Sequence, residues 1–119
     1  QFIRRHVPEI KEDDSVIVSA VKYWVYWNKM ADAISEWRYR IEDFREVLPE
    51  FMQRAEIEID INEFDKIATN FNTWKEITTK LTWDQLKEEL PDDLYSLLEN
   101  LANEYGYAIT DGYDAYIKR

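Results

Sequence analysis

The apolar residues between Ile17 and Leu48 recur at a spacing that constrains the fold more than any other feature of the chain. They lie at positions 17, 20, 24, 27, 31 and 34, in alternating steps of three and four, and then at 37, 41, 44 and 48. This period is typical of an amphipathic α-helix. Two successive steps of three meet at position 34, which rotates the apolar stripe near Ser35. The spacing predicts one long helix that bends there or two helices that meet, although the β-branched and aromatic run SVIVSAVKYWVYW also suits a strand locally.

Polar and proline residues mark the limits of this helical region. Asp13, Asp14 and Ser15 offer side-chain oxygens for an N-cap, so a helix is expected to begin there. Residues 1–14 are then an approach segment, followed by a single helical domain over residues 15–119. Pro49 is expected to close the region, because proline interrupts the hydrogen bonding of a helix.

The middle of the chain predicts a short strand and a further helix. Charge and isoleucine alternate in EIEIDI, residues 56–61, with the two-residue period of a half-buried strand. Asn62 is expected to cap the helix that follows. The apolar face of that helix is formed by Phe64, Ile67, Phe71, Trp74 and Ile77.

Residues 81–119 predict two helices and a hairpin. Thr82 and Gln85 have the spacing of a capping box, and Pro91 stands where proline can open the second helix, which Gly106 ends. The leucines expected to face inward are Leu94, Leu97, Leu98 and Leu101. Asp111-Gly112 suits the type I′ turn of a two-residue hairpin. This order resembles a winged helix, so the predicted fold class is mainly α, a compact helical bundle with a C-terminal winged-helix-like helix-helix-β-hairpin unit.

The second of these helices has the wrong charge for a duplex reader. Residues 91–106 contain Asp92, Asp93, Glu99 and Glu104 and neither lysine nor arginine. A helix in the major groove needs cations against the phosphates. One functional alternative is therefore an acidic winged-helix-type module that docks on a basic protein partner or mimics DNA.

The negative charge is concentrated at the C-terminal end of the chain. The net charge is -10, with 8 basic and 9 acidic residues in 1–48 but 3 basic and 9 acidic residues in 81–119. A polyanion can therefore approach the N-terminal half.

The composition excludes several classes of enzyme. The chain has no cysteine, one histidine (His6) and two glycines, Gly106 and Gly112, both expected at structural stops. Thiolate chemistry, a histidine-based metal cage or triad and a glycine-rich phosphate loop are therefore excluded within it. We expect no enzymatic activity and no metal site. The sequence also lacks an apolar run of membrane-spanning length and a signal peptide, so we expect a cytoplasmic protein without membrane contact. Because it begins at Gln1, we expect a piece of a longer chain.

The strongest binding pattern is Trp37-Arg38-Tyr39-Arg40. Cations interleaved with aromatic residues suit single-stranded nucleic acid or nucleotides, because bases stack on rings while guanidinium groups hold phosphates. The lysines and tyrosines near residues 22–29 have a similar arrangement. The predicted phosphate contacts are Arg4, Arg5, Lys22, Lys29, Arg38, Arg40 and Arg45, and the predicted stacking residues are Tyr23, Tyr26 and Tyr39.

Each of these residues also has a structural interpretation. Trp24, Trp27 and Trp37 lie on the apolar stripe and are expected in the core. The arginines can be neutralised on the helix surface by neighbouring carboxylates, for which the chain offers Glu36, Glu42, Asp43 and Glu46.

The composition and the FIRRH and WRYR clusters resemble a known family. A small, cysteine-free helical module rich in Tyr, Trp, Ile and Glu is similar to the helix-bundle accessory domain of archaeal plasmid primase-polymerases. The resemblance covers nearly the whole chain. It implies a non-catalytic module that binds single-stranded template DNA and nucleoside triphosphates, with magnesium, beside an attached catalytic domain.

Overall fold

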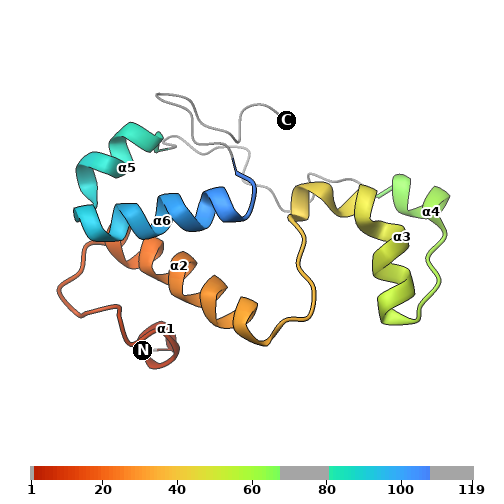
Figure 1. The fold of residues 1–119 in the computed structure, drawn as a ribbon, viewed down its shortest axis with the longest axis horizontal. Helices are drawn as coiled ribbons and strands as arrows, with labels where there is room; N and C mark the ends of the chain where they lie inside the picture. Colours follow the sequence, from red (N-terminus) through yellow and green to blue (C-terminus); the bar gives the residue numbers. More distant parts are fainter. Residues whose placement is uncertain (1, 68–80, 108–119) are drawn as a thin grey trace. The chain divides into compact units, whose positions relative to one another are not determined.

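The computed structural model describes residues 2–67 and 81–107, and within these ranges the chain is mainly helical and contains no strand (Figure 1). This confirms the predicted mainly α class. The helices are α1 (Phe2–His6), α2 (Val16–Ile34), the 3₁₀ helix η1 (Ile41–Asp43), α3 (Phe44–Ala55), α4 (Ile61–Asp65), α5 (Trp83–Glu89) and α6 (Asp92–Glu104).

The contacts divide the chain into two compact units. Unit 1 comprises Gln1–Glu36 and Thr79–Arg119, and unit 2 comprises Trp37–Thr78. The single domain expected over residues 15–119 stays a prediction.

The core of unit 1 forms where α2 packs on α6 and α5 packs on α6 (Figure 1). Val25 is fully buried, and the other core side chains retain at most 8% exposure. The buried cluster consists of Val21, Val25, Leu90, Leu94, Leu98 and Leu101. Leu97 packs against it, so all four leucines predicted to face inward from α6 do so.

The apolar stripe of α2 differs from the predicted one. Val21 and Val25 occupy the core rather than the expected positions 20 and 27, and Ile34 is 85% exposed. Trp24 packs on the core as predicted, but Trp27 is outside it. The β-branched Val21 and Val25 pack with the leucines of α6, and the indole of Trp27 lies against Tyr23 and His6 instead.

Residues 2–14 are packed more closely than an approach segment would be. Phe2–His6 form a helix, Val7 is 1% exposed and Ile10 is 6% exposed. Ser15 then caps α2, with its side chain accepting a hydrogen bond from the backbone N–H of Val18. The predicted start of α2 is therefore confirmed.

Unit 2 begins where the long predicted helix breaks. Ser35 is extended, residues 35–40 are not helical, and helical structure resumes at η1 and α3. The position of the break near Ser35 is confirmed, but the two helices do not meet directly. Pro49 lies inside α3, so its predicted role as a stop is wrong. The helix tolerates the lost hydrogen bond because Leu48 beside it is completely buried.

The strand predicted for residues 56–61 is also wrong. Glu56 ends α3 in the left-handed conformation (φ 55°), and α4 begins at Ile61. Asp60 caps α4 by accepting from the backbone N–H of Asn62, so the cap lies two residues before the predicted one. The charged residues Glu56 and Asp60 of this segment are therefore the caps of two helices and not the polar face of a strand. Helix α4 ends at Asp65 and Ile67 is 63% exposed, so the helix predicted from residue 62 does not continue through residue 67. Its predicted part from residue 68 to residue 78 lies outside the described residues.

The predicted ends of α5 and α6 are confirmed. Thr82 and Gln85 form both hydrogen bonds of a capping box, at 3.2 and 2.9 Å. Pro91 precedes the first residue of α6, and Gly106 follows the helix with φ 83°. The expected hairpin around Asp111 and Gly112 lies outside the described residues.

Candidate nucleic-acid interface

The predicted binding residues are divided between the two units. Unit 1 carries Arg4, Arg5, Lys22, Tyr23, Tyr26 and Lys29, and unit 2 carries Arg38, Tyr39, Arg40 and Arg45. Neither unit therefore carries the whole predicted set.

In unit 1 a row of four rings connects α1 to α2. Tyr23 stacks on Trp27 with 5.4 Å between ring centroids, and Trp27 meets His6 edge-on at 6.4 Å. His6 contacts Phe2 at 4.5 Å, one helical turn earlier in α1. Phe2 is 65% exposed. This row, called the aromatic row below, thus ends in a ring that is open to solvent.

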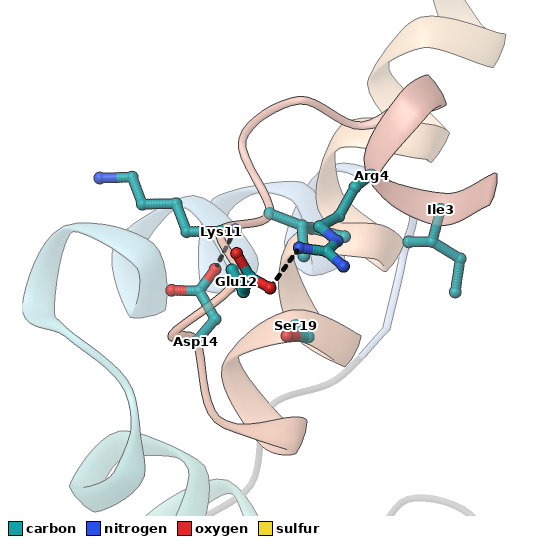
Figure 2. A pocket seen from close by; sticks show the side chains of 7 residues that line it. Ile3, Arg4, Lys11, Glu12, Asp14 and Ser19 are labelled. Carbon is teal, nitrogen blue, oxygen red and sulfur yellow. Dashed lines mark hydrogen bonds and ion pairs between the residues drawn. The ribbon is translucent and has the colours of Figure 1, made fainter. Parts of the chain in front are cut away.

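Helix α1 also carries two arginines, Arg4 and Arg5. Arg4 lies 3.8 Å from Glu12, a long ion pair in which the Glu12 side chain is 91% exposed. Figure 2 shows this pair at a surface hollow of about 280 Å³. Arg5 is exposed and forms no ion pair with any residue of the described ranges. Both guanidinium groups are therefore available to an anion at little cost.

Lys22, in contrast, forms an ion pair with the carboxylate of Asp14. Its ammonium lies 2.7 Å from Oδ2 of Asp14, and the two side chains are only 16% and 13% exposed. The hydrogen bond from Lys22 lowers the pKa of Asp14, and the backbone N–H of Lys11 lowers it further. Lys22 thus holds the segment before α2 in place and is a poor phosphate ligand.

Tyr26 and Lys29 share a different stripe of α2 from the aromatic row. They stand four and seven residues after Lys22, which places all three on one side of the helix. Lys29 is exposed and forms no ion pair within the described part of the chain. Tyr26 lines a hollow of about 340 Å³ with Asp93 and Leu94 of α6. Lys22, Tyr26 and Lys29 therefore do not join the aromatic row.

In unit 2 the cation of Arg45 is held by Asp65. Nε and Nη2 of Arg45 donate to the two carboxylate oxygens at 2.6 and 3.1 Å. This bidentate bond raises the pKa of Arg45 and lowers the pKa of Asp65. The pair joins α3 to α4, so its first role is structural.

Arg40 is paired in the same way. Nε and Nη2 donate to Asp43 at 2.8 and 3.1 Å, which lowers the pKa of that carboxyl. Neutralisation of Arg40 by Asp43 was one of the structural alternatives, and it is confirmed. Tyr39 packs among other rings of unit 2 and is 38% exposed. Arg38 is exposed and also has an interaction partner.

Sequence reasoning missed three members of the aromatic row. Trp27 is expected in the core from its place on the apolar stripe, and His6 and Phe2 are not among the predicted binding residues. The signal was the four-residue spacing of Phe2 and His6, which places two rings on one side of a single helical turn.

Other kinds of site find no support in the described residues. Residues 2–67 and 81–107 contain no group of three or more His, Asp or Glu side chains placed to hold a metal ion. No helix in these ranges combines the length and apolar character needed to cross a membrane. The chain matches no protein-family model, no curated protein and no solved structure.

Proposed function

We propose that the chain is a non-catalytic accessory module that binds single-stranded nucleic acid at the aromatic row of unit 1. The observation that carries the proposal is the continuous contact from Tyr23 through Trp27 and His6 to the exposed Phe2, with two lightly engaged arginines on the same short helix.

The chemistry of the row suits an unpaired strand. Each base that stacks on an aromatic side chain contributes about 1–3 kcal/mol without regard to sequence. Arg5, next to His6 in α1, can then contact a phosphate beside these bases. A base on Phe2 has the best access, because that ring is 65% exposed.

A double helix fits the same surface poorly. Its bases are already stacked on one another and present no free faces to an aromatic side chain. The net charge of -10 also works against a duplex, since binding there depends largely on neutralising many phosphates. A few local cations beside stacking rings favour a single strand.

The experiment that tests this function is a titration with a fluorescent oligothymidylate at low salt. Arg5→Gln and Phe2→Leu should each weaken binding by about fivefold or more, the equivalent of one stacked base or one phosphate contact. Lys66→Gln is the matched control, because it removes one positive charge from an exposed lysine of unit 2 that pairs with Glu63. Equal losses in all three variants, or no binding by the unaltered chain, would refute the proposal.

The wider role follows from the family resemblance. We place the module in the cytoplasm, beside the catalytic domain of a primase-like protein, where it holds template and binds nucleoside triphosphate with magnesium. The chain itself should then show no nucleotide turnover. Turnover by the purified chain, abolished by one carboxylate substitution, would contradict this role.

The charge of α6 favours a second candidate function, an acidic protein-interaction module or DNA mimic of winged-helix type. Asp92 and Asp93 in the first turn are exposed, and α6 contains no lysine or arginine. A basic partner would be captured by this face. Asp92→Asn with Asp93→Asn should abolish that capture and leave oligothymidylate binding unchanged or stronger.

A further inference from the structure

Unit 2 contains a cluster of aromatic rings among its described residues. Phe44 lies at its centre, with ring centroids 5.5 Å from Tyr39, 5.3 Å from Phe51 and 5.6 Å from Phe64. Trp37 joins the cluster only through Tyr39, at 5.0 Å. The indole of Trp37 is therefore anchored by one neighbour among these rings.

An arginine covers the indole of Trp37. The guanidinium carbon of Arg54 lies 4.9 Å from the ring centroid. Nε and Nη2 of Arg54 are 3.0 and 2.9 Å from Oε1 of Glu50, one turn earlier in α3. Both side chains of this pair are about half exposed, at 47% and 49%. A flat, half-exposed cation thus covers a half-buried indole, in the place that a flat base would take.

We propose that Trp37 and Arg54 form a binding site for an unpaired nucleobase and its phosphate. The base stacks on the indole, and Arg54 exchanges the carboxylate of Glu50 for the phosphate. Trp37 begins the Trp37-Arg38-Tyr39-Arg40 pattern and is expected in the core, but it is only half-buried and is not part of the buried cluster. Arg54 is not among the cations predicted from the sequence. The inference deepens the proposed function, on which it rests, by adding a second contact located in the other unit.

The relative strengths of the interactions allow this exchange. An exposed pair four residues apart on a helix changes an equilibrium by about twofold, and an exposed cation–π contact by about two- to fivefold. Stacking of a base on an aromatic side chain is worth about fivefold to more than a hundredfold. The guanidinium also regains an ionic partner in the phosphate, with the bidentate geometry that arginine offers.

The test follows the indole N–H signal of Trp37 by NMR during two separate titrations. One uses a nucleoside monophosphate and the other a short oligothymidylate, so that a free nucleotide and a strand are distinguished as the source of the base. We expect the signal of Trp37 to shift with at least one of them. Arg54→Gln should then weaken that binding by about threefold or more, since one charged hydrogen-bonding partner is lost.

Glu50→Gln should change the affinity for the ligand in the opposite direction. It releases Arg54, so affinity should rise by about twofold. Glu46→Gln is the matched control, because it removes a carboxylate from the same helix that forms no ion pair with a described residue. Equal effects of Glu50→Gln and Glu46→Gln would show a general charge effect and overturn the proposed exchange.

Two further outcomes separate this site from the proposed function. If Trp37 is unaffected at saturating ligand while Phe2→Leu still weakens binding, the site in unit 2 is refuted and the function stands. If neither ligand binds at all, both fail. Circular dichroism of Arg54→Gln shows whether the variant retains its helices. If it does not, the site in unit 2 is judged from the shift of the Trp37 signal in the unaltered chain and from the comparison of Glu50→Gln with Glu46→Gln.

Discussion

Oδ2 of Asp14 accepts two hydrogen bonds, from the ammonium of Lys22 at 2.7 Å and from the backbone N–H of Lys11 at 2.8 Å. It thereby fastens the segment that follows α1 to the middle of α2. Because α1 contributes two of the four rings, the geometry of the aromatic row depends on this carboxylate. A lysine predicted to hold phosphate instead helps to position the residues that we propose for binding.

The first prediction concerns the pH dependence of stability. The pKa of Asp14 lies below its ordinary value of 3.8. The ionised Asp14 therefore stabilises the folded state fully above pH 3.8, and this stabilisation is lost as the pH falls through the lowered pKa. The pKa values of Asp43 and Asp65 are lowered by their arginine partners and act in the same direction. We expect the urea midpoint to fall as the pH drops below about 4, and Asp14→Asn to lose part of this dependence.

Asp13→Asn is the control for this experiment. Asp13 is exposed and forms no ion pair with a described residue, so its replacement should leave the acid-induced loss in place. A profile unchanged by Asp14→Asn would show that the bond to Lys22 does not stabilise the fold.

The second prediction tests the two units through their cores. Leu98→Ala in unit 1 and Leu48→Ala in unit 2 should each cost about 2–5 kcal/mol, because both side chains are buried. Val16→Ala should change the free energy of unfolding by about 0.5 kcal/mol or less, since Val16 is 87% exposed. Hydrogen exchange should show Leu48→Ala accelerating the amides of α3 and leaving those of α6 unchanged. Equal acceleration in both helices would mean that the chain unfolds as one unit.

The third prediction uses two residues with positive φ. Gly106 has φ 83° and Glu56 has φ 55°, each just after a helix. Gly106→Ala should lower stability by about 1 kcal/mol or more, because a Cβ is strained in this region. Glu56→Gly should have the opposite sign and raise stability by up to about 1 kcal/mol. Thermal unfolding of the two variants checks both signs, and effects of the same sign would contradict the backbone assignment.

Local signals in the sequence predicted the helix ends well. Ser15, the Thr82–Gln85 box and Gly106 act through hydrogen bonds or backbone angles within a few residues, so the sequence contains most of the information. The predictions for Pro49 and for residues 56–61 were wrong because the structure there depends on contacts that the local sequence does not show. Burial of Leu48 and the cap formed by Asp60 override the local preference, and periodicity alone does not reveal burial.

The sequence alone could not show which of the predicted cations have carboxylate partners. Of the seven predicted phosphate contacts, Lys22, Arg40 and Arg45 are paired with aspartates in the structure. Arg45 and Asp65, however, are twenty residues apart, so no spacing rule for a single helix could have shown that this arginine is occupied. The contact of His6 with Trp27 likewise depends on how the chain folds back between α1 and α2. Pairing across elements decided which of the predicted residues are available.

The last prediction compares occupied and available arginines through salt dependence. For a single strand, each phosphate contact that is lost reduces the slope of log affinity against log salt by about 0.7. Arg5→Gln should show this reduction, because Arg5 has no carboxylate partner among the described residues. Arg45→Gln should leave the slope unchanged and instead lower stability, since its guanidinium already binds Asp65 through two hydrogen bonds. Oligothymidylate titrations at four or more salt concentrations measure both slopes. If Arg45→Gln flattens the dependence and Arg5→Gln does not, phosphates displace Asp65, and the binding surface lies in unit 2 instead of at the aromatic row.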